Sequence, residues 1–212
     1  MELENLFIGA KDWNREAWVG AFYPIEMPEE WRLDFYANHF RTALVPQSVW
    51  LAWCDDDIDE MMEVIEGDYF FLIFEWHIQS GLNEVPSEAS KKTQLSNIKS
   101  KLADLAAGVA VFSQGSILYE SVLCGMPITL ISPEATLKEA SWVWQNQGLY
   151  YSGEPCMVLS HLPADTKQQT ALIQSFMQSL PEGKQGAPFI VANEVSFSQL
   201  NGLQVLSEML GY

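Results

Sequence analysis

Glu75 and His77 are the two side chains whose types and spacing best suit acid–base chemistry. They follow the apolar run Tyr69–Phe74, which is typical of a buried β-strand. Residues just past the carboxyl ends of parallel strands line the active face of α/β barrels. A carboxylate and an imidazole at that place could transfer protons or supply two metal ligands. Ordinary loop polarity also explains the pair, so both interpretations stay open, as does the question of whether the protein is an enzyme.

An acidic run over residues 55–66 has two explanations, a metal site or a plain helix. Asp55, Asp57, Asp59 and Glu66 match the ligand spacing of a calcium-binding EF-hand loop, but Glu60 stands where that loop requires glycine. Apolar residues in the same segment recur at helical spacing and therefore predict a plain acidic helix: Ile58, Met61, Met62 and Ile65. We accordingly expect neither a metal site nor a cofactor.

Other polar residues also have structural explanations. Gly115 and Ser116 could open a helix whose free N–H groups bind an anion, although a βαβ crossover with a helix that ends at Gly125 is the favoured explanation. His39 lies in an apolar and aromatic stretch and is expected to be structural, whereas His161 follows an apolar run. No G-x-S-x-G motif is present, so the sequence indicates no serine nucleophile.

Six short apolar runs alternate with amphipathic helical patterns, and these elements must position the polar residues. This order is typical of a parallel sheet whose faces are covered by helices. Helices are predicted over residues 90–106, 166–180 and 196–210, and no break in composition divides the chain, so we expect a single domain over residues 1–212. The strand-like runs are Leu6–Ala10, Thr42–Val45, Tyr69–Phe74, Gly108–Ser113, Pro127–Ser132 and Pro188–Ala192.

Two further apolar runs, Tyr150–Gly153 and Met157–Ser160, are separated only by Glu154, Pro155 and Cys156. Parallel neighbours need a crossover of about a dozen residues or more. One of these two runs is therefore not expected to be a strand of a parallel barrel.

Charge and composition limit the partners. The chain of 212 residues has 28 acidic and 11 basic side chains, a formal charge of −17, which argues against broad nucleic-acid binding and against attachment to anionic membranes. The arginines are Arg15, Arg32 and Arg41, so the later strands cannot supply an arginine clamp for phosphate or carboxylate. Three distant cysteines and an acidic start without a signal-peptide pattern make a reducing, cytoplasmic setting the expectation.

The N-terminal motifs resemble those of the YecE-like proteins, the family called domain of unknown function 72 (DUF72). The matching segments are Ile8–Trp13, Trp18–Pro24, Leu33–Ala37 and Phe40–Thr42, and a weaker similarity joins Val191–Asn193 to Asn201 and Gly202. The chain is identified as a divergent and shortened member. The resemblance implies an α/β fold of the TIM-type (β/α) barrel, with either seven clear strands or an irregular eighth.

The chain departs from the family pattern at polar positions. Where the resemblance implies a carboxylate and an amide after the second strand, this sequence has Leu44 and Pro46. The family's lysine at the end of the third strand falls at about Phe74 or Glu75, and its later arginine-containing motifs have no counterpart here. Much of the family's polar site is therefore expected to be replaced.

The expected function is the binding of a small polar molecule at the C-terminal mouth of the barrel. Glu75 and His77 are the candidate catalytic residues, Trp13 could stack on a ring, and Gln47 and Asn193 could fix polar groups. The alternative is a non-catalytic barrel that serves as a protein-interaction or scaffold module. The candidate ligand-binding residues are Lys11, Trp13, Gln47, Gln114 and Asn193.

Overall fold

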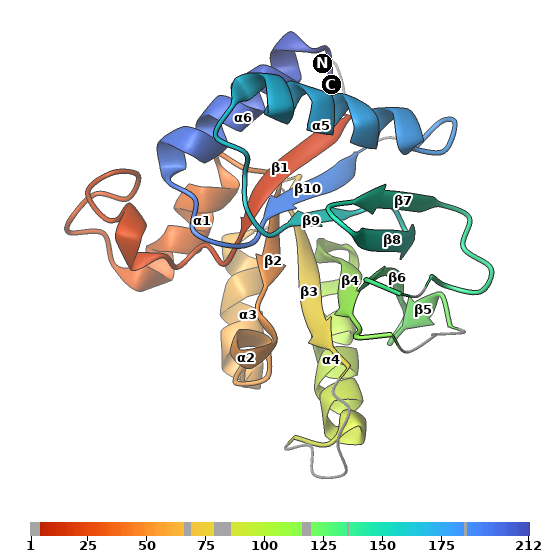
Figure 1. Cartoon of the computed structure of the whole chain (residues 1–212). Coiled ribbons are helices and arrows are strands. Elements are labelled where there is room, and N and C mark those ends of the chain that lie inside the picture. Colours follow the sequence, from red (N-terminus) through yellow and green to blue (C-terminus); the bar gives the residue numbers. More distant parts are fainter. Residues whose placement is uncertain (1–4, 66–68, 79–85, 116–119, 135, 185) are drawn as a thin grey trace. The chain divides into compact units, whose positions relative to one another are not determined.

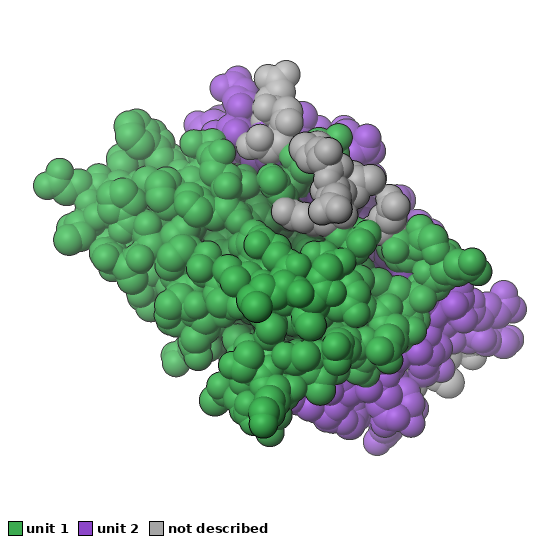
Figure 2. All heavy atoms as spheres, turned by 90° about the horizontal axis from the view of Figure 1, so that it is seen from above, with its two compact units in different colours: residues 1–44, 67–70, 156–212 green, residues 45–66, 71–155 purple. Residues whose placement is uncertain are grey.

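The computed structural model in Figure 1 describes residues 5–65, 69–78, 86–115, 120–134, 136–184 and 186–212. The chain divides into two compact units, coloured green and purple in Figure 2. Unit 1 comprises residues 1–44, 67–70 and 156–212, and unit 2 comprises residues 45–66 and 71–155. Both units are of the mixed α/β class. In the part of the chain that is described, each helix is too short or too polar to span a membrane.

Unit 1 is built on parallel strands that lie in the order β2 (Thr42–Val45), β1 (Leu6–Lys11), β10 (Ala187–Val191) and β9 (Met157–Leu159). Helix α6 (Phe197–Met209) packs on β1, and α5 (Thr166–Ser179) packs on α6 (Figure 1). Both helices begin where a side-chain oxygen, of Asp165 or Ser196, accepts a backbone N–H of the first turn. Shorter helices of this unit are η1 (Glu16–Trp18), η2 (Glu29–Trp31) and α1 (Arg32–Ala37).

Tyr36 is fully buried and joins β1 to β2. Its hydroxyl accepts the Ala10 N–H at 2.9 Å and donates to the Thr42 carbonyl oxygen at 3.0 Å. Burial raises the pKa of Tyr36 well above its ordinary value, which keeps this hydroxyl a donor. Gly9 allows the two backbones to approach, since a Cβ atom there would lie 2.0 Å from the carbonyl oxygen of Thr42.

Unit 2 contains a sheet in the order β7 (Val143–Asn146), β8 (Leu149–Gly153), β6 (Met126–Ser132), β4 (Ala106–Phe112) and β3 (Phe71–His77). The strands β3, β4 and β6 are parallel, whereas β8 is antiparallel to β6 and β7 to β8. Strand β5 (Val122–Leu123) also pairs with β6. The helices are α2 (Gln47–Trp50), α3 (Asp55–Val64), α4 (Glu88–Leu102) and η3 (Ala103–Leu105).

Helix α3 confirms the acidic helix that the sequence predicts, and its carboxylates contact α4. The Asn97 amide donates to Asp55 at 2.8 Å, and Lys101 forms an ion pair with Asp59 at 2.8 Å. The hydrogen bond from Asn97, followed by the charge of Lys101, lowers the pKa of Asp55. These carboxylates therefore bind side chains of the neighbouring helix. Glu66, the last residue of the calcium-loop pattern, lies outside the described residues.

The six predicted apolar runs each overlap a strand, but the third strand is displaced toward the C-terminus. Strand β3 covers Phe71–His77 rather than Tyr69–Phe74, because its parallel pairing with β4 continues through Glu75 and His77. The placement of the candidate catalytic residues in a loop after the strand is therefore wrong. Glu75 and His77 are instead part of the carboxyl end of β3.

The structure confirms that one of the two runs Tyr150–Gly153 and Met157–Ser160 is not a strand of a parallel barrel, as their short connection predicts. Strand β8 is antiparallel to β6 and so is not a strand of a parallel barrel, whereas β9 is parallel to β10. The parallel β-α alternation accordingly stops after β6 in unit 2.

The segment after Gly115 differs from the sequence expectation. Ser116, the proposed start of an anion-binding helix, lies outside the described residues. Residues Val122–Leu123 form a strand, so a helix that continues to Gly125 is wrong. Cys124 and Gly125 have φ angles of 51° and 79° and form the two-residue turn of a hairpin between β5 and β6. Positive φ at both central residues is typical of such a turn.

The close approach of β1 and β2 makes a specific prediction. Gly9→Ala places a methyl group against the Thr42 carbonyl and should lower the free energy of unfolding by about 1–3 kcal/mol or more, measured by urea denaturation. Gly202→Ala is the matched control, because Gly202 lies inside α6 with open space around it. This substitution should raise the free energy of unfolding by about 0.5–1 kcal/mol. Equal effects of the two substitutions would contradict this account of β1 and β2.

Candidate functional site

Glu75 and His77 form a carboxylate–imidazole pair at the end of β3. Residues two apart in a strand point to the same face, and here Oε1 of Glu75 lies 3.2 Å from Nε2 of His77. The two side chains differ in exposure, since 7% of the Glu75 side chain and 43% of the His77 side chain are accessible to solvent. The carboxylate is therefore buried behind an imidazole that reaches the surface.

Gln47 holds both residues of the pair. Its backbone N–H donates to Oε2 of Glu75 at 3.1 Å, and its side-chain Oε1 accepts the backbone N–H of His77 at 2.8 Å. Pro46 precedes it with φ −58° and ψ 143°, so the chain leaves the extended conformation of β2 and begins the short helix α2 at Gln47. The sequence-predicted residues Gln47, Glu75 and His77 are thus brought together in unit 2.

Aromatic rings surround this end of β3. The Trp50 indole N–H donates to the main-chain carbonyl of Glu75 at 2.9 Å, and the Trp50 ring stacks on Trp76 with centroids 6.0 Å apart. The His77 ring stacks on Phe112 of β4, with centroids 5.1 Å apart. These contacts fix the imidazole and the main chain of Glu75 in one arrangement.

Lys91 of α4 also reaches the end of β3, and sequence reasoning did not include it among the site residues. Its side chain is buried, with Nζ 3.4 Å from the His77 carbonyl oxygen and 5.1 Å from the centroid of the Trp76 ring. The signal was present in the spacing, because Lys91 occupies the same helical face as Leu95 and Ile98.

The chemistry available at this end of β3 is proton transfer. A carboxylate that accepts a hydrogen bond from an imidazole orients the ring and stabilises its protonated form. When Nε2 of His77 is engaged by Glu75, Nδ1 is the nitrogen that would exchange a proton with a ligand. Among the described residues, no group of three or more His, Cys, Asp or Glu side chains is arranged to hold a metal ion.

Three other predicted site residues lie in unit 1, at the carboxyl ends of its strands. Lys11 ends β1, Trp13 follows it, and Asn193 follows β10. The Asn193 amide lies 3.2 Å from Nε2 of His161, and the Tyr23 hydroxyl donates to the Trp13 carbonyl oxygen at 2.5 Å. Gln114, by contrast, belongs to unit 2, where it is exposed after β4.

Arg15 ties the ends of β1 and β10 together within unit 1. Its guanidinium donates to the carbonyl oxygens of Lys11, at 2.9 Å from Nε, and of Asn193, at 3.1 Å from Nη1. It also lies 5.2 Å from the Trp18 ring centroid, and burial lowers its pKa. Arg15 thus reaches the end of β10 from a distant part of the sequence and binds main-chain carbonyl groups there.

Comparisons with known proteins support the fold. No protein-family model and no curated protein sequence matches this chain. A solved structure of a DUF72 family protein from Thermotoga maritima MSB8 matches it with a TM-score of 0.56 and 10% sequence identity, covering 98% of this chain and 99% of the other. The chain has the fold of a DUF72 protein. The resemblance that the N-terminal motifs indicate is thereby confirmed at the level of the fold.

The departures from the DUF72 pattern after the second strand have a structural counterpart. Leu44, where the family resemblance implies a carboxylate, is fully buried, and its carbonyl oxygen accepts the Asp12 N–H at 2.9 Å. Pro46, where the resemblance implies an amide, immediately precedes α2. Neither side chain can transfer a proton.

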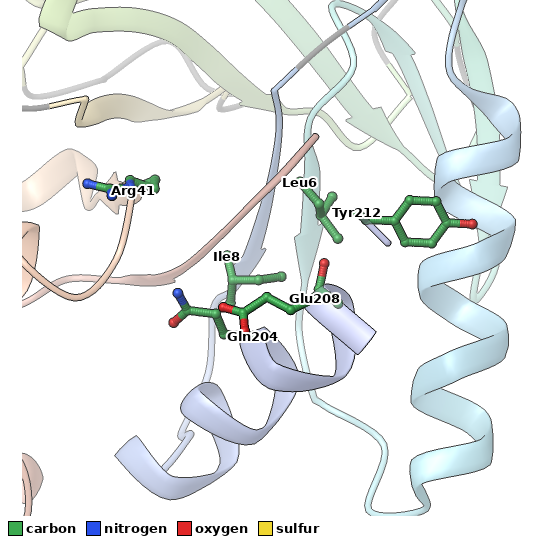
Figure 3. Close-up of a pocket in the computed structure, with 7 residues that line it drawn as sticks. Leu6, Ile8, Arg41, Gln204, Glu208 and Tyr212 are labelled. Carbon is green, nitrogen blue, oxygen red and sulfur yellow. The ribbon is translucent and has the colours of Figure 1, made fainter. Parts of the chain in front are cut away.

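A small pocket lies at the opposite end of β1 in unit 1 and is shown in Figure 3. Its space is on the order of one water molecule. The buried hydroxyl of Ser207 lines it and has no hydrogen-bond partner among the described residues, and a water molecule in the pocket would provide one. The other lining residues are Leu6, Ile8, Arg41, Gln204, Glu208 and Tyr212.

The role of Gln47 can be tested without a ligand. Gln47→Ala removes the acceptor of the His77 N–H, and the free energy of unfolding should fall by about 1 kcal/mol. Exchange of the His77 amide proton, followed by NMR, should become faster because this N–H loses its partner. Ser48→Ala, an exposed change on the same helix, is the control and should alter neither quantity. Unchanged exchange in Gln47→Ala would contradict the network.

Proposed function

We propose that this chain is a divergent DUF72 family member that binds a small polar molecule through Glu75 and His77 at the carboxyl end of β3. The observation that carries the proposal is the 3.2 Å contact between a buried carboxylate and a partly exposed imidazole. The TIM-type closure of the strands remains a prediction of the family resemblance. The proposed site uses Gln47, Glu75 and His77, all of which belong to unit 2.

The cost of burying a carboxylate supports a functional interpretation of the pair. An ionised carboxylate loses hydration on burial, and only hydrogen bonds and nearby positive charge compensate for that loss. Glu75 accepts the Gln47 N–H and contacts His77, whose ring it orients in return. A purely structural position at the end of β3 would be filled at lower cost by an apolar residue, as Leu44 fills the end of β2.

The ligand suited to this arrangement is small and carries both a hydrogen-bond donor and an acceptor. The imidazole can give or take a proton, and the Phe112 ring against which it stacks offers an apolar surface beside it. A reaction at this place would be a proton transfer to or from the ligand, with His77 as acid or base and Glu75 as the group that orients it.

The second candidate function is a non-catalytic interaction or scaffold module. It is favoured by the full burial of Leu44 and Trp50 and by the use of the Trp50 indole to bind the Glu75 main chain. On this hypothesis the polar network stabilises the end of β3 and binds no ligand. The two candidates predict opposite outcomes in a ligand screen.

A thermal-shift screen against sugars, inorganic phosphate, carboxylic acids and divalent metal ions distinguishes the candidates. A specific ligand at about a hundredfold excess over its Kd should raise Tm by about 5–10 °C. The double variant Glu75→Gln, His77→Ala should lose that shift. The control variant Glu182→Gln, His39→Ala makes the same two changes at exposed positions elsewhere and should keep it.

Two outcomes would contradict the binding proposal. One is the absence of a shift with every compound, which would favour the scaffold function. The other is an equal shift in the wild type and in the Glu75→Gln, His77→Ala variant, which would place the ligand elsewhere on the protein.

A further inference from the structure

The segment between β1 and α1 presents large apolar side chains to solvent. Ile25 is 80% exposed and Trp31 is 63% exposed. Most tryptophans of a folded chain bury the greater part of their surface, so a Trp exposed to this extent beside an exposed Ile marks a candidate contact surface. Figure 1 shows this part of unit 1 as the orange loop that precedes α1.

Hydrogen bonds hold this segment in a defined conformation. The Met27 N–H donates to the Pro24 carbonyl at 3.0 Å and the Trp31 N–H to the Pro28 carbonyl at 3.2 Å, which makes two consecutive turns. The two turns follow one another directly along the chain, so Ile25, in the first turn, and Trp31, which closes the second, are both held by ordered backbone. A surface that is already ordered loses little conformational entropy when a partner binds.

The contacts behind the segment anchor it to unit 1. Arg32 is buried, pairs with Glu16 at 2.8 Å, and lies 5.6 Å from the Tyr23 ring centroid. The Asn14 amide donates to Glu29 at 3.3 Å. Arg32, the first residue of α1, is therefore directed inward, and the exposed glutamates of the preceding turns define the charge of the outer surface.

The charge around the two apolar side chains selects the partner. Glu26, Glu29 and Glu30 are exposed between Ile25 and Trp31. These carboxylates would repel nucleic acids and anionic membranes, and in a chain of charge −17 they would also oppose pairing with a second copy. A partner that carries lysine or arginine among aliphatic side chains complements both features.

We propose that Ile25, Trp31 and the carboxylates of Glu26, Glu29 and Glu30, here called the Trp31 surface, dock a basic segment of another protein. Trp31 is the apolar anchor, since tryptophan is prominent among residues that dominate binding energy at interfaces. The glutamates contribute charge complementarity around it. The Trp31 surface is independent of the Glu75–His77 pair, so either proposal can fail without the other.

Isothermal titration calorimetry tests this with a short synthetic peptide of alternating arginine and leucine, using the full chain. The peptide should bind the wild type, and Trp31→Ala should weaken binding by about tenfold or more. The double variant Glu26→Gln, Glu30→Gln should weaken it severalfold at low salt and reduce its salt dependence. Tyr69→Ala is the matched control, because Tyr69 is an aromatic residue of the same unit with 64% exposure, and it should leave binding unchanged.

Several results would overturn the proposal. Undiminished binding to Trp31→Ala would mean that the peptide responds only to net charge. If a matched peptide with glutamate in place of arginine bound equally tightly, charge complementarity with the glutamates would be excluded. Absence of binding to the wild type would exclude a basic partner of this kind. Self-association that Trp31→Ala abolishes, measured by sedimentation, would assign the surface to a second copy instead.

Discussion

The buried carboxylate of Glu75 is the constraint on which the end of β3 depends. A carboxylate with 7% of its side chain exposed must have hydrogen-bond partners, and the Gln47 N–H supplies one and the His77 imidazole another. The same requirement fixes the segment after β2. Helix α2 begins at Gln47, and Trp50, at its end, donates to the Glu75 main chain. Neighbouring segments of unit 2 are thus positioned around one charged group.

In unit 1 as well, buried polar groups near the strand ends have hydrogen-bond partners, and other side chains provide them. The Tyr36 hydroxyl satisfies an N–H of β1 and a carbonyl of β2, and the Arg15 guanidinium satisfies carbonyl groups at the ends of β1 and β10. Buried main-chain groups have to be paired, and here side chains pair them where the strands diverge or stop. Arg15 is therefore part of the framework that holds Lys11 and Asn193, rather than a clamp for an external anion.

The sequence contains enough local information to predict most elements. The apolar runs and the helical spacing of α3, α5 and α6 depend on neighbouring residues, and the structure confirms them. The proximity of Glu75 to His77 also follows from their spacing once they are placed in a strand. The contact of Arg15 with β10 and the antiparallel pairing of β8 depend on residues far apart in the chain, which periodicity does not encode. The burial of Lys91 is not predictable from its residue type, because lysine lies mostly at the surface, and here Trp76 and the His77 carbonyl offer it partners inside.

The chain departs from the polar pattern that the DUF72 resemblance implies at the ends of two strands, β2 and β3. After β2 the family resemblance implies a carboxylate, and the chain has a buried leucine that serves packing and a main-chain hydrogen bond. At the end of β3 the resemblance implies a lysine, and the chain has the acidic Glu75, while Lys91 arrives from α4. In this chain the carboxylate thus lies on β3 and the lysine on α4. Since recognition depends on which groups occupy which strand ends, a shared fold does not transfer a DUF72 ligand to this protein. The ligand that we propose has to match the carboxylate–imidazole pair that this chain itself provides.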